Sequence, residues 1–191
     1  MMNFLIFGPP GSGKGTQSIK LAEKFNLKHL STGDMLREEV ESGSSIGSRV
    51  ETIMKNGELV PDSIVIEMIA SRVDNTPDVG GFIFDGFPRT VEQATALDVM
   101  LRSRDSKICK MLVLDVEHNE LVDRLNARAA ISGRADDQDV EVIENRVAVY
   151  REKTEPVINY YNEQGKYETV NGMGKIPEIF ERLSVEIGKC K

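Results

Sequence analysis

One segment limits the possible folds of this chain more than any other, the glycine-rich run GPPGSGKGT at Gly8 to Thr16. It comes directly after the apolar run Asn3 to Phe7 and directly before a stretch with the apolar spacing of an amphipathic helix. Glycines allow a tight loop whose N–H groups converge on an anion, the helix N-terminus adds positive partial charge, and Lys14 can reach the outer phosphates. A glycine-rich turn can also be a plain strand-to-helix connection, but the lysine and both flanks favour a phosphate-binding loop.

The run departs from the strict pattern G-x-x-x-x-G-K-S/T at one position. Gly15 stands where a serine or threonine is expected, and Thr16 follows one residue later. We still expect the loop to hold the phosphates of a nucleoside triphosphate. The residues expected to make these contacts are Gly11, Ser12, Gly13, Lys14, Gly15 and Thr16.

Short β-rich runs alternate with longer segments of helical spacing along the chain, such as the apolar stripe from Ile176 to Ile187. This alternation predicts an α/β fold of the P-loop NTPase type, with a five-stranded parallel sheet and helices on both faces. The predicted strands are Asn3–Phe7, Lys28–Ser31, Phe82–Asp85, Met111–Val116 and Tyr167–Val170.

The composition fits one globular domain, with 191 residues of which 40% are hydrophobic. The formal net charge of -7 argues against nonspecific binding to nucleic acid or to an anionic membrane. A polyanionic ligand must therefore be held by a local group of cations. The first apolar run is too short for a signal peptide or a membrane span. We expect a cytoplasmic protein, because the two cysteines have no disulfide or zinc spacing and fit a reducing compartment.

The cysteines and histidines suggest no metal site and no covalent chemistry. Cys109 and Cys190 have neither a C-x-x-C spacing nor a nearby histidine, so the sequence predicts no disulfide framework and no structural zinc. His29 and His118 have no triad context. We expect both histidines to be structural or exposed.

A second motif, Asp85-Gly86-Phe87-Pro88-Arg89-Thr90, follows the predicted strand Phe82–Asp85. Open α/β sheets bind ligands at the carboxyl ends of their strands. Asp85 could hold magnesium through its water shell, and Arg89 could bind a phosphate with two hydrogen bonds. An isolated Asp-Gly pair at a strand end is more often a simple turn, so this motif depends on the phosphate-binding loop for its weight.

Arginines are a third signal, because an acidic chain places several of them on predicted ligand-facing elements. Surface arginines are often solvated or paired with carboxylates. For any single arginine, that interpretation is about as good as a role in ligand binding. As a set they match phosphoryl transfer, in which fixed cations stabilise charge that develops on the moving group. The set is Arg37, Arg89, Arg124, Arg128, Arg134 and Arg146.

Two segments fit neither a strand nor a crossover helix. The run Thr32 to Pro61 is long, polar and punctuated by glycine, and Ala130 to Asp139 is predicted as a short polar loop. We expect both to be insertions at the edge of the sheet. No repeat and no linker rich in Pro, Gly or Ser divides the chain.

Taken together, these motifs resemble the nucleoside monophosphate kinases, and within them the adenylate kinases with a short lid. The likeness covers nearly the whole chain. The run GPPGSGKGT resembles the family's own form of the P-loop, which also accounts for the displaced threonine. The runs Ser31 to Arg37 and Gly57 to Pro61 resemble the two ends of the family's AMP-binding flap, and Asp85 to Gln93 matches the segment D-G-F-P-R-T-x-x-Q.

The resemblance implies a role for each matched position. It divides a single domain, 1–191, into a core (1–31, 61–127 and 138–191), a helical flap (32–60) and a short lid (128–137). ATP would be bound by Arg124, Arg128 and Gly174. The transferred phosphoryl group would be contacted by Arg134 and Arg146. The lid would also carry an acidic pair, Asp136 and Asp137. The residues implied at AMP are Thr32, Arg37, Glu58, Leu59, Val60, Gly86, Phe87, Pro88, Arg89, Gln93, Arg134 and Arg146.

The acceptor base is predicted from Thr32 and Gln93. Relatives that act on UMP and CMP carry alanine at the position of Thr32, and a glutamine amide can donate and accept at the N6 and N1 edge of adenine. Without the resemblance, Gln93 would be read as an exposed helix residue. The favoured acceptor is therefore AMP, and a pyrimidine monophosphate kinase is the nearer alternative.

The resemblance thus implies a monomeric kinase with Mg²⁺ as cofactor and ATP, AMP and ADP as small-molecule partners. The residues implied in catalysis are Lys14, Arg89, Arg124, Arg128, Arg134 and Arg146, which would act by positioning and charge. A P-loop switch that signals through a protein partner is the alternative from another class. No guanine-reading motif supports it.

Overall fold

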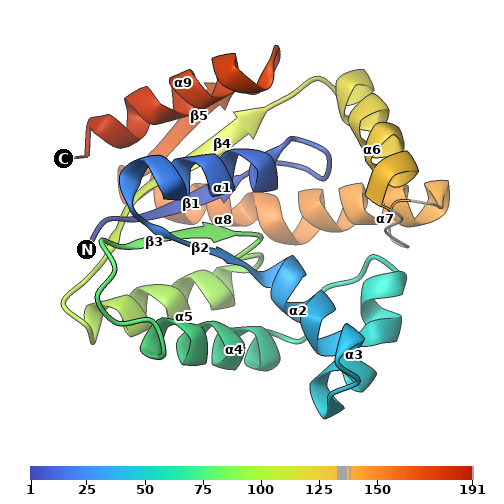
Figure 1. Ribbon diagram of the computed structural model, residues 1–191, viewed down its shortest axis with the longest axis horizontal. Coiled ribbons are helices and arrows are strands. Elements are labelled where there is room, and N and C mark those ends of the chain that lie inside the picture. The colour runs from blue at the N-terminus through green and yellow to red at the C-terminus, as the bar shows by residue number, and fades with distance from the viewer. Residues whose placement is uncertain (133–136, 138, 191) are drawn as a thin grey trace.

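The computed structural model describes residues 1–132, 137 and 139–190. It contains the predicted five-stranded sheet, in which all pairings are parallel and the strand order is β2-β3-β1-β4-β5 (Figure 1). The strands are β1 (Asn3–Phe7), β2 (Lys28–Ser31), β3 (Phe82–Asp85), β4 (Ile108–Asp115) and β5 (Tyr167–Asn171). The predicted fold class is confirmed.

Alternate residues of the central strands face two separate apolar layers, as expected for a parallel sheet covered on both sides. In β1, Phe4 and Ile6 belong to one layer and Leu5 and Phe7 to the other. The first layer packs against α1 (Lys14–Phe25) and α9 (Ile176–Gly188). The second packs against α4 (Asp62–Asp74), α5 (Val91–Arg102) and α8 (Glu155–Asn162). Figure 1 shows α1 and α9 on one side of the sheet and α4 and α5 on the other.

The segment between β2 and α4 is helical. It forms α2 (Thr32–Glu41) and α3 (Ser45–Lys55), which pack against each other beyond the end of the sheet (Figure 1). Each helix is preceded by an N-cap serine, Ser31 or Ser44, whose side chain accepts a hydrogen bond from the backbone N–H three residues on. The polar composition of this segment thus reflects capped helices that expose much of their surface.

The chain between β4 and β5 is helical for most of its length. It forms α6 (His118–Ser132), α7 (Val140–Val149), a π-helical turn η2 (Tyr150–Thr154) and α8. The prediction that a loop begins at Ala130 was wrong, because α6 continues to Ser132. Alanines favour helix, and the run Ala129-Ala130 extends α6 by another turn.

Strand boundaries also differ slightly from the prediction. β4 begins at Ile108 rather than at Met111, and it ends at Asp115 rather than at Val116. Its first residues pair with the start of β1, where the register shifts between Asn3 and Phe4. This pairing comes from the neighbouring strand, so a short sequence window could not reveal it. β5 extends one residue further than predicted, to Asn171.

Candidate active site

The glycine-rich loop joins β1 to α1, as its position in the sequence predicted. Gly11 has φ +85°, and a Cβ there would lie 2.8 Å from the carbonyl oxygen of Leu121 on α6. Only glycine combines that backbone conformation with so close an approach. Lys14 opens α1, and its Nζ folds back to donate to the carbonyl oxygens of Gly8 (2.7 Å) and Pro9 (2.9 Å). In this position its ammonium group lies over the ring of the loop.

The charge on Lys14 is not fixed at neutral to mildly alkaline pH. Burial lowers the pKa of Lys14 from its ordinary 10.5 to about 8, against the opposing attraction of Asp85. Arg89, Arg146 and Arg128 lower this pKa further, since they add like charge nearby. The lysine therefore lies in a site that is rich in positive charge and ready for an anion.

Asp85 ends β3 next to the start of α1. A Cβ on Gly15 would lie 3.4 Å from Asp85 Oδ2, so the strand end and the P-loop meet closely. His29 Nε2 lies 3.5 Å from the same carboxylate oxygen, and His29 is half-buried. The sequence prediction assigned His29 no neighbour in the site, because β2 and β3 pair only in the folded sheet.

The segment after β3 carries the predicted acceptor residues. The peptide bond between Phe87 and Pro88 is cis. The carbonyl oxygen of Gly86 accepts from Thr32 Oγ1 (2.7 Å) and from Arg89 Nε (2.8 Å). These two hydrogen bonds link the start of α2 to the end of β3.

Gln93 is 1% exposed and lies in the first turn of α5, although a helix glutamine with no ligand role would be expected at the surface. Its side chain bonds to Asp62 and to the backbone of Arg89. The sequence analysis missed Asp62, which contacts the site through its hydrogen bond with Gln93. An acidic first residue is ordinary at a helix N-terminus, so its position alone gave no sign of a further role.

Three arginines of the sequence prediction, Arg124, Arg128 and Arg146, lie on α6 and α7. Arg124 donates to Glu120 and to the carbonyl oxygens of Ser12 (3.3 Å) and Gly172 (3.0 Å), so it joins α6 to the P-loop and to the end of β5. Arg128 and Arg146 both bind Asp137.

Asp137 has a fully buried side chain between these two guanidinium groups. Its carboxylate accepts from Arg128 at 2.6 and 2.7 Å and from Arg146 at 2.6 Å. Burial disfavours the ionised form, but the hydrogen bonds from both arginines outweigh it and hold the pKa of Asp137 below its ordinary value. The carboxylate of Asp137 thus lies between the two arginines, in the place where they could otherwise bind a phosphate.

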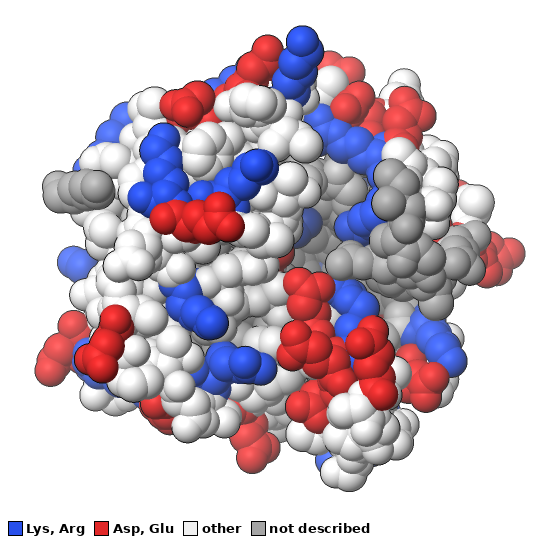
Figure 2. All heavy atoms as spheres, viewed as in Figure 1, with Lys and Arg blue, Asp and Glu red and all other residues white. Residues whose placement is uncertain are grey.

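These elements enclose one large cavity of about 800 Å³, a volume in the range of small-molecule sites. Figure 2, in the same view as Figure 1, shows a hollow near the centre of the molecule, with Lys and Arg atoms in and beside it. Of the predicted site residues that the structure describes, all but three line this cavity. They are Gly11, Gly13, Lys14, Gly15, Thr16, Thr32, Arg37, Glu58, Leu59, Val60, Asp85, Gly86, Pro88, Arg89, Gln93, Arg124, Arg128, Arg146 and Gly174.

The three exceptions among the described residues are Ser12, Phe87 and Asp137, which do not line the cavity. Ser12 is fully buried beneath the loop, and Phe87 is 1% exposed and packs against Phe84 in the core. Arg134 and Asp136 lie outside the described residues.

The far end of the flap touches α7 across the cavity. Asn145 Nδ2 donates to the carbonyl oxygen of Asn56 at 2.7 Å. A Cβ on Gly57 would lie 2.6 Å from Cγ of Arg146. Residues 56 and 57 therefore pack directly against the helix that carries Arg146.

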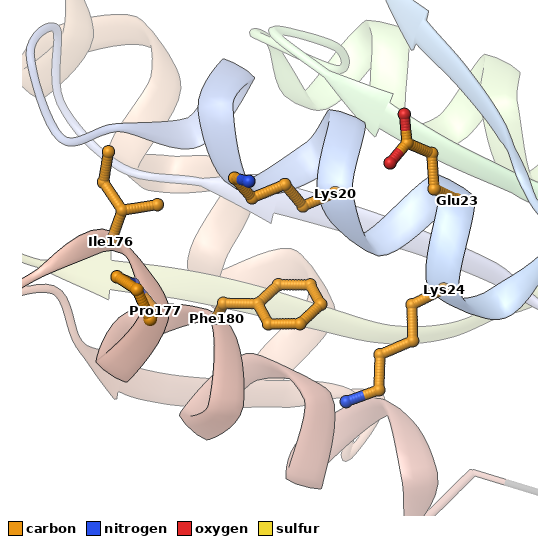
Figure 3. A pocket seen from close by; sticks show the side chains of 6 residues that line it. All are labelled: Lys20, Glu23, Lys24, Ile176, Pro177 and Phe180. Atoms are coloured by element: carbon orange, nitrogen blue, oxygen red, sulfur yellow. The ribbon is translucent and has the colours of Figure 1, made fainter.

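A second hollow, of about 540 Å³, lies between α1 and α9 (Figure 3). Lys24 Nζ lies 4.9 Å from the centre of the Phe180 ring, within cation–π range. The second hollow is lined by Lys20, Glu23, Lys24, Ile176, Pro177 and Phe180, and none of them is a predicted site residue. The larger cavity is thus the candidate active site.

Comparison with known proteins agrees with this geometry. Residues 6–166 match the family model described as adenylate kinase. The chain belongs to the adenylate kinase family. An adenylate kinase of Flavobacterium psychrophilum is 48% identical over 184 residues, which cover 96% of this chain and 97% of that protein. One of Bacteroides fragilis is 48% identical, with 96% of each chain covered, and one of Methanothrix thermoacetophila is 41% identical, with 98% and 99% covered.

Family membership confirms the predicted enzyme class, a nucleoside monophosphate kinase. In the part of the chain that the structure describes, no helix is both long and apolar enough to cross a membrane. The same residues contain no group of three or more His, Cys, Asp or Glu side chains that could hold a metal ion. The cytoplasmic location and the monomeric state stay predictions.

Proposed function

We propose that this protein transfers the γ-phosphoryl group of ATP to AMP and produces two ADP, in a reversible reaction that serves adenine nucleotide balance. One observation carries the proposal. A single cavity is lined on one side by the P-loop and on the other by the flap and the segment Gly86 to Gln93, with arginines between them. Two nucleotides could meet there phosphate to phosphate, and the adenylate kinase relatives favour this reading.

On the donor side, the backbone of the P-loop and Lys14 would hold the ATP phosphates. Gly11, Gly13, Gly15 and Thr16 line the cavity at that loop. Arg124 and Arg128 extend the positive charge along α6. Gly174, after β5, is exposed at the cavity and would contact the donor adenine.

On the acceptor side, Arg37 and Arg89 would bind the AMP phosphate and Gln93 its adenine. Arg37 is hydrogen-bonded to Asp34, and Arg89 to Gly86, so both are oriented before a ligand arrives. Val60, Leu59 and Glu58 would close over the nucleoside. Thr32 would support this wall through its bond to Gly86.

Magnesium fits the residues at the end of β3. Asp85 is 8% exposed and stands beside the P-loop, and Mg²⁺ takes few carboxylates while it keeps several waters. Asp85 would thus hold the ion through water. When bound, the ion would neutralise charge on the ATP phosphates.

The reaction needs positioning and charge rather than a general base. Direct in-line transfer spreads negative charge over the moving phosphoryl group, and fixed cations in a dry site stabilise that charge. Lys14, Arg89, Arg128 and Arg146 all line the cavity and would do this. Flap and lid must exclude water during transfer, since water would compete with AMP as acceptor.

The test is a direct comparison of AMP, UMP, CMP and GMP as acceptors, with MgATP as donor and separation of the products. We expect ADP from AMP at a kcat/KM at least tenfold above that for any other acceptor. Preference for UMP or CMP would identify a pyrimidine monophosphate kinase instead. Tight ATP binding with no transfer to any acceptor would favour a nucleotide-binding switch.

A further inference from the structure

The side-chain amide of Gln93 is held at both ends by the protein. Its Nε2 donates to Asp62 Oδ1 at 2.7 Å, and its Oε1 accepts from the backbone N–H of Arg89 at 2.7 Å. A carboxylate can only accept and a backbone N–H can only donate, so these partners permit one orientation of the amide. A half-turn of the amide would put oxygen against carboxylate and N–H against N–H.

Asp62 is itself fixed by a second set of bonds. Its Oδ2 accepts from Thr90 Oγ1 at 2.8 Å, and the same hydroxyl accepts from the backbone N–H of Gln93 at 3.1 Å, where it caps α5. Asp62 is the first residue of α4, two residues after the end of the flap. A closed ring of hydrogen bonds thus joins the end of the flap to the first turn of α5.

The remaining hydrogen-bonding capacity of Gln93 can be counted. An amide offers two N–H donors and an oxygen with two acceptor positions. Asp62 takes one N–H donor and Arg89 takes one acceptor position of the oxygen. One donor and one acceptor are therefore left for a ligand at the cavity wall, and the donor and the acceptor cannot exchange places.

The two kinds of purine present opposite orders to such an amide. A 6-aminopurine has a donor at position 6 and an acceptor at N1, whereas a 6-oxopurine has an acceptor at position 6 and a donor at N1–H. Because ribose and phosphate fix the base in its place, an amide that cannot turn satisfies only one of these orders. Hydrogen-bonding groups left unpaired in a buried site cost enough binding free energy to give strong discrimination between the two kinds of purine.

We propose that Asp62 determines the purine specificity of the acceptor site, because it locks Gln93 in the orientation that accepts a 6-amino group and rejects a 6-oxo group. The proposal rests on the proposed function, in which AMP is the acceptor. Asp62 acts through Gln93 and is a positioning residue.

The test measures kcat/KM for AMP and for inosine monophosphate (IMP), whose base carries a 6-oxo group and an N1–H. Asp62→Ala leaves space for water, which can donate or accept, so the amide can turn. We expect the preference for AMP over IMP to fall about tenfold or more, the equivalent of one lost hydrogen-bond preference. KM for ATP should stay within about twofold, since Lys14 and the P-loop are untouched.

Asp98→Ala is the matched control, because Asp98 also accepts several hydrogen bonds, from Tyr160, Tyr161 and Gln164. None of these partners lines the cavity, whereas Gln93, the partner of Asp62, does, so loss of Asp98 should lower stability and leave the AMP-to-IMP ratio unchanged. If Asp62→Ala does not fold, Asp62→Ser carries the test, since a hydroxyl both donates and accepts and should relax the ratio in the same direction.

An equal loss of kcat/KM for AMP and IMP in the folded Asp62 variant would overturn the proposal and leave the proposed function intact. Failure of the unaltered enzyme to use AMP would instead overturn the proposed function.

Discussion

At the scale of single residues, Lys14 links the fold to the chemistry most directly. The backbone carbonyls of Gly8 and Pro9 hold its ammonium group, and burial lowers its pKa to about 8. A bound phosphate chain is negatively charged, so it favours the protonated lysine and raises this pKa. Proton uptake and nucleotide binding are therefore linked.

We predict that ATP binding at pH 8.5 is accompanied by uptake of roughly half a proton or more, and that uptake falls toward zero at pH 7. The sign follows from the pKa, because above about 8 the free protein is mostly neutral at Lys14 and the complex is charged. Affinity for ATP should accordingly weaken as the pH rises past 8. Calorimetry in buffers of different ionisation enthalpy measures the uptake.

Lys14→Met should abolish the pH-dependent part of this uptake and reduce turnover sharply, while the fold stays intact. Lys20→Met is the control, because Lys20 lies on the same helix, exposed and outside the large cavity. Uptake that persists unchanged in Lys14→Met would assign the proton to another group.

At the scale of elements, the flap and α7 meet closely at Asn56 and Gly57. Gly57 has φ +72°, and a Cβ there would lie 2.6 Å from Cγ of Arg146. Gly43, in the same flap, has φ +67° and nothing within 4 Å of the position of a Cβ. The two glycines therefore share a backbone conformation and differ in their neighbours.

Gly57→Ala should raise KM for AMP and lower kcat by about tenfold or more, because the methyl group pushes Arg146 away from the transferred group. Gly43→Ala carries the same backbone strain and should cost about 1 kcal/mol of stability, with kinetics near those of the unaltered enzyme. Steady-state kinetics and urea unfolding of both variants make the comparison. Similar kinetics for the two would show that the contact at Arg146 has no part in turnover.

Features confined to a short stretch of chain could be predicted from the sequence. The P-loop lies within one strand end and the turn after it, so its spacing and flanks identified it. The Asp85 to Gln93 segment was identified only together with the P-loop and, at Gln93, through the family resemblance. The role of Asp62 could not be predicted, since its partner Gln93 is 31 residues away and meets it only in the folded chain. The helical end of α6 was missed because polar residues after Ala130 outweighed the alanines in that reading.

At the scale of the whole molecule, a chain of net charge -7 collects its ligand-facing cations in one cavity. Both sides of that cavity belong to segments that the sheet holds together. A ligand that spans both sides should therefore stabilise the entire fold more than a ligand that fills one side.

We predict that diadenosine pentaphosphate, two adenosines joined by five phosphates, raises the Tm more than ATP or AMP at equal concentration. At about 100 times its Kd the gain is about 2.7 kcal/mol, or roughly 5–10 °C for a chain of this size. Thermal unfolding followed by circular dichroism measures the shift. Inorganic tripolyphosphate is the control for charge alone, and a shift no larger than that of ATP would contradict a two-nucleotide cavity.

The buried carboxylate of Asp137 has a consequence for how substrates come and go. In the proposed reaction, a phosphate that reaches Arg128 and Arg146 competes with Asp137, whose single carboxylate is already hydrogen-bonded to both. The net gain on binding is smaller than two bare cations would provide, and the carboxylate can reclaim its partners when the products depart. An internal anion of this kind keeps the arginines oriented between turnovers. It also offsets part of the cost of separating the arginines from ADP, because the carboxylate pairs with them again.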